Sequence, residues 1–260
     1  MLSMTALANA QIVINEIYGG SENSGAVLKN NYIVLKNIGT VPASLSGATI
    51  QYAPAVGAFT QYHTLPDITL NPEQSYLVQE AAIGNGTVNL PAPDFIATAV
   101  TNFDGTVNKS IGIKISGVSG KIALASDKVQ IPGPVSSNVL DFVGYGANAD
   151  QFKGDGPAPS PTPSAALKRI SGNSEDNKID FSIEGNAKSD FVQNPFIKNG
   201  EIIFGTEIGD IKVYDTFRRV VKKAATKTAL ALDITELPKG TYIVTGTINN
   251  VPVSQKIVKD

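Results

Sequence analysis

The sequence predicts an all-β protein built as two β-sandwiches in series. Short β-branched runs alternate with clusters of Gly, Asn, Pro and Ser along most of the chain. No apolar pattern with the helical period of 3.6 lasts ten residues with a cap at its start. A new series of runs begins near residues 187–190. Many short strands separated by turn signals are typical of a sandwich or a barrel.

The first series of runs contains seven expected strands. They are residues 11–18, 32–37, 48–52, 75–79, 110–116, 121–126 and 139–145. In residues 110–116, Ile111, Ile113 and Ile115 alternate with small or polar residues, which is the period of a half-buried strand. A Ser/Gly-rich turn leads from this run into residues 121–126, where the alternation continues. The two runs are therefore predicted to pair as a hairpin.

The second series defines a second domain. It comprises residues 201–204, 210–214, 219–221, 229–234, 241–247 and 253–258. The Pro-rich residues 154–163 are interpreted as a loop inside the first domain, because strand-like residues follow at 179–183. Residues 190–260 carry a net charge of +2, against −4 for the rest of the chain. The predicted domains are residues 11–187 and 190–260.

Composition excludes several kinds of function. The 260 residues include no cysteine and one histidine, which removes disulfides, thiolate catalysis, Cys-ligated zinc and His-rich metal sites. The formal net charge is −2, so the chain lacks the basic field that binding to nucleic acid requires. No apolar run approaches the roughly 20 residues of a membrane-spanning helix, so no transmembrane segment is expected.

Residues 1–10 have features of the end of a signal peptide. Ala8 and Ala10 lie three residues and one residue before a cleavage point at Gln11, which is the spacing that signal peptidase favours. The charged and apolar regions of a signal peptide are missing, so we interpret residues 1–10 as its remnant. The alternative is an ordinary N-terminus.

A series of motifs between residues 11 and 187 resembles the bacterial lamin tail domain. The motifs are IVINEIYGG (12–20), NYIVLKN (31–37), LSGATI (45–50), LNPEQSYLV (70–78), VLDFVGYG (139–146), LKR (167–169) and DF (180–181). The resemblance implies an immunoglobulin-like β-sandwich. Val34 replaces a Glu that the family often has, and Ala48 replaces a Trp, so a ligand contact made by that Glu is in doubt here.

Residues 190–260 resemble the C-terminal sorting domain of type IX secretion cargo, the export route of Bacteroidetes. The supporting motifs are NP (194–195), NG (199–200), IKVYD (211–215), LDI (232–234), LPKGTYIV (237–244) and KIVK (256–259). The family usually has a Gly after the Val-Tyr-Asp strand, where this chain has TFRR (216–219). The resemblance implies a second immunoglobulin-like sandwich, export through the periplasm to the outside, and an interaction with the secretion machinery.

The sequence predicts no catalytic site. His63 is interpreted as a surface or hydrogen-bonded residue, and no nucleophile elbow or phosphate-binding loop is present. Paired carboxylates could support glycoside hydrolysis. The sequence offers five candidate carboxylates, but their spacing does not indicate that any two lie together. They are Glu16, Glu80, Asp94, Asp104 and Asp141. Tyr52, Phe59 and Tyr62 are interpreted as core and rim residues, with an exposed aromatic patch as the alternative.

The polar run at residues 173–180 is a candidate calcium site. Oxygen-bearing side chains suit a hard cation, and the candidate ligands are Asn173, Glu175, Asp176 and Asp180. The run lacks the alternating order of acidic residues in an EF-hand loop, and the positive charge of Lys178 would repel a cation. The alternative is a solvated polar turn, and no other cofactor is expected.

Taken together, these features favour a non-catalytic protein that is secreted or displayed on the cell surface. Its lamin-tail-like domain would bind or tether an extracellular ligand that the sequence does not identify. One alternative is a secreted hydrolase that uses paired carboxylates. Another is an accessory subunit that docks onto a separate surface enzyme.

Overall fold

The computed structural model describes residues 11–82, 84, 86–90, 93–109, 112–170, 172, 175–185, 196–198, 200–224, 228–248 and 251–259. The chain divides into two compact units, Met1–Ala187 and Lys188–Asp260. Across the described residues the regular structure is almost entirely β, and the helical part is one turn, α1 (Asn177–Asp180). The predicted all-β fold class is confirmed.

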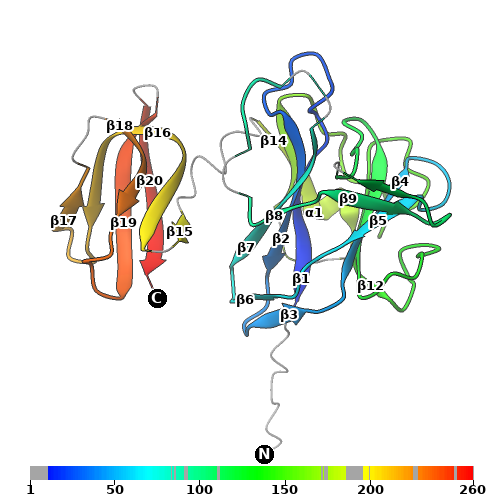
Figure 1. The fold of residues 1–260 in the computed structure, drawn as a ribbon, viewed down its shortest axis with the longest axis horizontal. Coiled ribbons are helices and arrows are strands. Elements are labelled where there is room, and N and C mark those ends of the chain that lie inside the picture. Colours follow the sequence, from blue (N-terminus) through cyan, green and yellow to red (C-terminus); the bar gives the residue numbers. More distant parts are fainter. Residues whose placement is uncertain are drawn as a thin grey trace, which may run out of the picture. The chain divides into compact units, whose positions relative to one another are not determined.

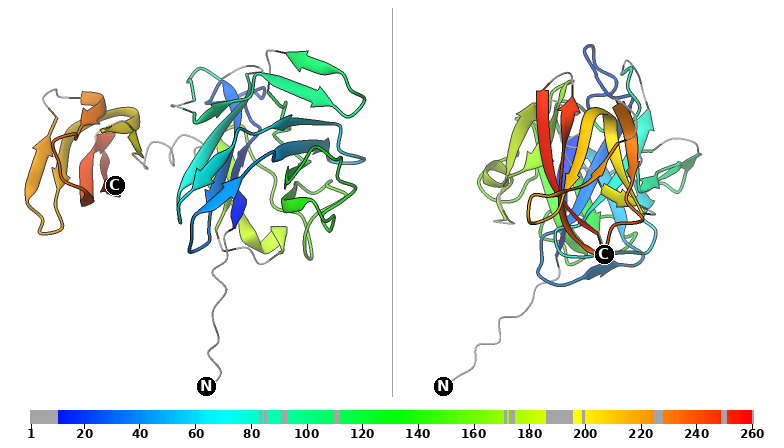
Figure 2. Two further views of the ribbon diagram at one scale, coloured as in Figure 1. Left: turned by 60° about the horizontal axis from the view of Figure 1, so that its bottom comes forward. Right: turned by 90° about the vertical axis from the view of Figure 1, so that its left-hand side faces the viewer.

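The first unit contains two six-stranded sheets, which Figures 1 and 2 show as two layers. Sheet 1 has the order β14 (Phe181–Gly185), β13 (Ala165–Arg169), β1 (Ile12–Tyr18), β2 (Asn30–Asn37), β7 (Ser75–Ala82), β8 (Phe95–Ile96). Sheet 2 has the order β10 (Val107–Lys109), β9 (Ala99–Asn102), β5 (Gln61–Thr64), β4 (Thr49–Pro54), β11 (Gly120–Ala125), β12 (Val139–Tyr145). The short strands β3 (Ala43–Leu45) and β6 (Ile68–Leu70) form a separate pair.

One apolar core joins the two sheets. Ile14 and Ile33 from sheet 1 lie in the same buried cluster as Ile50, Ile122 and Val143 from sheet 2, and all five side chains have no exposed surface. Because side chains alternate across a strand, each sheet turns one row of β-branched residues towards the other. The first unit is therefore a β-sandwich.

The predicted hairpin between residues 110–116 and 121–126 is wrong. Residues 112–116 form no strand, and β11 pairs instead with β4 and β12. Ile113 and Ile115 are nevertheless fully buried, as their alternation predicted. Their segment is held against β7 by other hydrogen bonds, from Ile113 N to a Glu80 carboxylate oxygen and from Ala81 N to Ile113 O. In residues 112–116, alternate side chains are therefore buried although the segment does not pair as a β-strand.

The second unit is built around one long strand, β16 (Glu201–Tyr214). β16 pairs with β15 (Phe196–Lys198), β17 (Val220–Lys223), β18 (Thr228–Asp233) and β19 (Gly240–Ile248), and β19 pairs with β20 (Val251–Lys259). The core of this unit includes Ile202, Val213 and Ile234, which have no exposed surface. Lys259 Nζ donates hydrogen bonds to Ile234 O at 2.8 Å and Thr235 O at 2.9 Å, which fastens β20 to the turn after β18.

Candidate functional site

The strand β11, which lies between β4 and β12, is buried on both faces, which is unusual for an antiparallel strand with alternating residues. Ile122 and Leu124 face the main core, whereas Ala123 and Ala125 belong to a second, smaller core on the outer face of sheet 2. The neighbouring strands β4 and β12 add Ala53 and Phe142 to that smaller core, and two loops cover it. Phe59 comes from the loop between β4 and β5, and Ile131 comes from the loop between β11 and β12.

Lys121 stands on this covered outer face, and its side chain has no exposed surface. Its Nζ donates to Gly57 O at 2.5 Å and forms an ion pair with Asp150. A second Asp150 oxygen accepts from Gly57 N at 2.8 Å. A buried lysine needs such partners, because an unpaired buried charge is costly. The Lys121–Asp150 pair therefore fastens the β4–β5 loop to the loop that follows β12.

An open surface hollow of about 440 Å³ lies beside this ion pair. We call it the loop pocket, and its lining residues are Gly57, Ala58, Gln130, Ile131, Pro132, Asp150 and Gln151. They come from three loops, after β4, after β11 and after β12. The volume falls within the range of about 300–1,000 Å³ that is common for small-molecule sites. Loops held on a rigid sheet are a frequent place for binding sites in β-sandwiches.

The two glutamine amides in the loop pocket have orientations fixed by their partners. Gln130 Nε2 donates to Phe59 O, and Gln151 Nε2 donates to Pro132 O at 2.9 Å. A carbonyl oxygen can only accept, so the NH₂ end of each amide must face it. Both NH₂ ends thus join one loop to another through one N–H each, and the side-chain oxygens and the second N–H groups remain for a ligand.

Asp150 is held in its ionised form. Partial burial acts to raise the pKa of its carboxyl group, but the hydrogen bonds from Lys121 and Gly57 and the positive charge of Lys121 outweigh it and lower the pKa. A carboxylate and an ammonium group therefore lie side by side at the loop pocket and cancel in net charge.

The loop pocket was not predicted from the sequence. Lys121 occupies a polar position in an alternating strand, which normally faces solvent. The available signal was that the next outward positions are Ala123 and Ala125, small residues that leave room for covering loops. Tyr52 and Phe59 are buried, and Tyr62 packs against Phe103 with ring centroids 5.0 Å apart. These three aromatic residues are core and rim residues rather than an exposed patch.

His63 is buried and is hydrogen-bonded to a carboxylate. Its Nε2 lies 2.7 Å from Glu80 Oε1, and the other Glu80 oxygen accepts from Ile113 N at 2.7 Å. Burial alone would lower the pKa of His63, but the charge and hydrogen bond of Glu80 outweigh it and raise the pKa. Because β5 belongs to sheet 2 and β7 to sheet 1, this contact joins the two layers.

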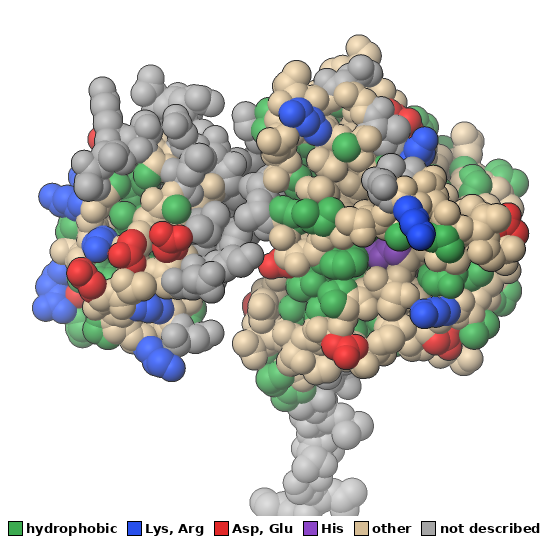
Figure 3. All heavy atoms as spheres, in the orientation of Figure 1, with side chains coloured by type: hydrophobic (Ala, Val, Ile, Leu, Met, Phe, Trp, Pro, Cys, Tyr) green, Lys and Arg blue, Asp and Glu red, His purple; other side chains and the backbone are tan. Residues whose placement is uncertain are grey.

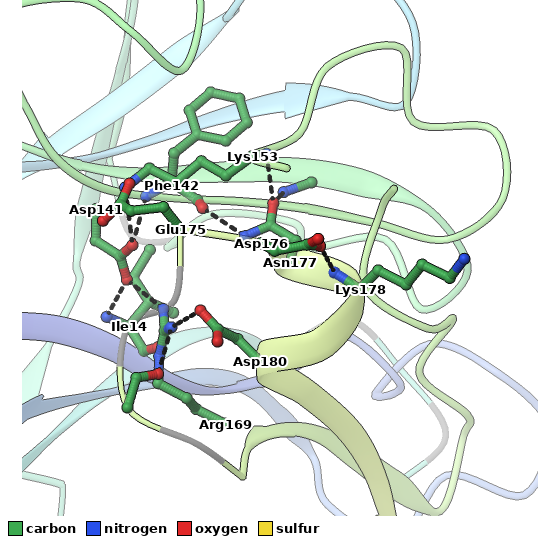
Figure 4. Close-up of polar contacts among 12 residues, drawn as sticks. Ile14, Asp141, Phe142, Lys153, Arg169, Glu175, Asp176, Asn177, Lys178 and Asp180 are labelled. Atoms are coloured by element: carbon green, nitrogen blue, oxygen red, sulfur yellow. Dashed lines mark hydrogen bonds and ion pairs between the residues drawn. The ribbon is translucent and has the colours of Figure 1, made fainter. Parts of the chain in front are cut away.

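A second buried ion network surrounds Arg169 at the end of β13 (Figure 4). Its guanidinium donates to Asp141 at 2.7 Å, to Asp180 at 2.8 Å and to Ile14 O at 3.1 Å, and it lies over the Phe181 ring. The Arg169, Asp141 and Asp180 side chains are at most 1% exposed. The guanidinium brings the two carboxylates together, but no substrate can reach them there, so their role is to hold four segments of the chain.

The candidate calcium ligands are placed around this network. Asn173 lies outside the described residues. Glu175 pairs with Lys153 at 2.6 Å, and Asp180 pairs with Arg169. Asp176 caps α1 by accepting from Lys178 N at 2.9 Å.

Each of these three described carboxylates therefore has a cation or a backbone N–H as its partner. Among the described residues, no group of three or more His, Cys, Asp or Glu side chains could hold a metal ion. The calcium site stays a prediction, and the geometry of its described members favours the polar-turn alternative.

The remaining carboxylates that were considered for hydrolysis also have structural contacts. Glu16 accepts a hydrogen bond from the Tyr32 hydroxyl. Asp94 accepts from Leu77 N at 2.8 Å, and Asp104 accepts from Thr106 N at 2.8 Å. On the face of the first unit that Figure 3 shows, charged side chains are scattered singly among neutral groups. That face presents no basic patch for nucleic acid.

The second unit matches a known protein family. Residues 194–260 match the family of secretion system C-terminal sorting domains. The search of curated proteins returned no match for the chain. In the described part of the chain, no helix has the length and apolar character needed to cross a membrane. The matched domain indicates export through type IX secretion to the cell surface or the extracellular space, and it implies an interaction with that secretion machinery.

Proposed function

We propose that this chain is a non-catalytic binding or tethering protein that acts outside the cell. The second unit serves as the address for export, and the first unit serves as the binding module. The match of residues 194–260 to the sorting-domain family is the observation that carries the export part of the proposal, and the loop pocket supports the binding part. Residues 1–10, which lie outside the described residues, would be the remnant of the signal peptide that first directs the chain to the periplasm.

The buried network around Arg169 supports the interpretation of the first unit as a lamin-tail-like domain. The residues that meet in this network come from separate motifs of that resemblance, namely Ile14, Asp141, Arg169 and the Asp180–Phe181 pair. Residues that recur together in a family for structural reasons are expected to be in contact. These contacts hold segments of the sandwich together, so we place the ligand site elsewhere.

The carboxylates of the first unit support a non-catalytic role. A glycosidase needs two accessible carboxyl groups on opposite sides of a bond. Glu16, Glu80 and Asp141 are buried and engaged with Tyr32, His63 and Arg169. The loop pocket instead offers one ionised carboxylate that is already paired with Lys121. This arrangement suits recognition of a ligand rather than proton transfer.

Removing residues 190–260 should trap the protein in the periplasm. The experiment compares full-length and truncated chains by fractionation of the native host, with immunodetection in periplasm, cell surface and medium. A matched control is the full-length Ala58→Phe variant, which alters the loop pocket alone and should be exported normally. Delivery of the truncated chain to the surface would contradict the proposal.

A further inference from the structure

We propose that the loop pocket binds a neutral, hydroxyl-rich ligand, specifically one sugar unit of an extracellular glycan. This inference rests on the proposed function, because it names the ligand class of the binding module. It follows from three properties of the loop pocket: its net charge, the kind of hydrogen-bonding groups it offers, and its fixed shape.

The net charge of the loop pocket excludes strongly ionic ligands. Asp150 is the charged residue in the lining, and its carboxylate is neutralised by the buried Lys121. A cationic ligand would have to compete with Lys121, which has no exposed surface and cannot turn to solvent. An anionic ligand would meet the Asp150 carboxylate. A neutral ligand avoids both costs.

Most of the side-chain hydrogen-bonding sites that the loop pocket offers are acceptors. One N–H of each amide, on Gln130 and Gln151, bonds to a backbone carbonyl, so the side-chain oxygen and the second N–H of each remain. Asp150 contributes two carboxylate oxygens, each of which has lone pairs beyond its contacts with Lys121 and Gly57. A matching ligand must supply several hydrogen-bond donors, and some acceptors for the remaining N–H groups, in a small volume. Neighbouring hydroxyl groups on a sugar ring do so without carrying a charge.

The remaining lining groups are apolar. Ala58, Ile131 and Pro132 lie in the same loop pocket as the acceptors. A pyranose ring has the corresponding character, because its hydroxyl groups point outward around the ring and its faces carry C–H groups. With no aromatic ring in the lining, binding would depend on hydrogen bonds and shape more than on stacking.

The loop pocket is preorganised for such a ligand. Five side-chain contacts fasten its three loops together, and they involve Lys121, Asp150, Gln130 and Gln151. The lining residue Ile131 is 1% exposed and packs in the small core beneath. Binding would therefore order little further chain, which preserves affinity for a small ligand.

The test is calorimetric titration of the purified full-length chain with defined oligosaccharides. The neutral probes are maltohexaose, cellohexaose, laminarihexaose and mannohexaose. An oligogalacturonate serves as the anionic probe and a chitosan hexamer as the cationic probe. We expect at least one neutral probe to bind and the two charged probes to bind more weakly. No binding of any neutral probe up to about 10 mM would overturn the proposal, as would preferential binding of a charged one.

Three variants locate the site. Ala58→Phe fills the loop pocket without removing a hydrogen bond and should abolish binding. Gln151→Ala removes an acceptor and also the loop contact to Pro132 O, and should weaken binding at least about three- to tenfold, the effect of one hydrogen bond. Gln74→Ala, on the exposed turn before β7, is the matched control and should bind as the unaltered chain does.

Unaltered binding in both Ala58→Phe and Gln151→Ala would overturn the placement of the ligand, provided thermal melts show that both variants are folded. These outcomes leave the export test unaffected. Failure of the sugar proposal is therefore distinguishable from failure of the proposed function.

Discussion

At the scale of single residues, the buried histidine makes the stability of the first unit depend on pH. Glu80 raises the pKa of His63 in the folded chain above its ordinary value of 6.5. The folded state therefore binds the proton more tightly than the unfolded state does. The stabilisation is fully present below the unfolded pKa and is lost as the pH rises through the folded pKa. His63 is the one histidine of the chain, so no other imidazole obscures this effect.

We expect the His63→Gln substitution to flatten the pH dependence. Glutamine can still donate a hydrogen bond to Glu80 but does not titrate. Urea unfolding measured from pH 5.5 to 8.5 should show that the free energy of unfolding of the unaltered first unit, relative to the variant, falls as the pH rises. Identical slopes for the two proteins would mean that the His63–Glu80 contact contributes no linked proton.

At the scale of elements, the loop between β12 and β13 is fitted closely against α1. Gly154 has φ +77°, and a Cβ atom there would lie 2.5 Å from Asp176 Cβ and 2.6 Å from Asp176 Cα. Glycine thus meets two demands at this position, a left-handed backbone and the absence of a side chain. Gly25 meets the first demand alone, since it has φ +86° and no atom within 4 Å of its Cβ position.

These two glycines allow packing to be separated from backbone strain. Gly25→Ala should cost about 1–2 kcal/mol of folding free energy, the cost of a left-handed alanine. Gly154→Ala should cost about 1–3 kcal/mol more, because the methyl group displaces the α1 cap. Urea unfolding of the first unit measures both variants. Equal losses would show that the contact with Asp176 relaxes without cost.

The described candidate calcium ligands lie beside this loop and in α1, and the calcium hypothesis can be tested there. Because Glu175, Asp176 and Asp180 are already engaged, we expect identical thermal melts in millimolar calcium and in chelator. Occupation at a hundredfold excess over Kd would instead add about 2.7 kcal/mol. Asp176→Ala should lower stability by about 1 kcal/mol in both conditions, through loss of the helix cap. A calcium-dependent gain that disappears in Asp176→Ala would restore the calcium site.

At the scale of the whole molecule, the two units have separate cores and are expected to unfold separately. Ile122→Ala and Ile202→Ala form a matched pair, since both side chains are fully buried, one in each unit. Each should cost about 2–5 kcal/mol. Calorimetry should show two transitions, with each substitution lowering the melting temperature of one. A single transition that either substitution shifts as a whole would contradict independent folding.

A strand could be predicted from the sequence where an apolar run both is buried and pairs with neighbouring strands. Residues 139–145 are rich in apolar residues and form β12 with the same bounds. Residues 110–116 carry a more regular alternation, yet the described part of that run bonds to Glu80 and Ala81 of β7 without forming a strand. The loop pocket was beyond prediction for a related reason. Lys121 is buried because residues distant in sequence, such as Phe59 and Ile131, cover it.

The position of β1 has a consequence for when the first unit can fold. β1 lies between β2, its neighbour in sequence, and β13, and Arg169 of β13 bonds to Ile14 across 155 residues. Sheet 1 therefore cannot close until almost the whole first unit has been synthesised. Structures dominated by such distant pairings fold slowly, because the chain loses the entropy of closing a long loop before stabilising contacts form to offset it. For an exported chain, this delay lengthens the time for which the first unit stays unfolded after synthesis.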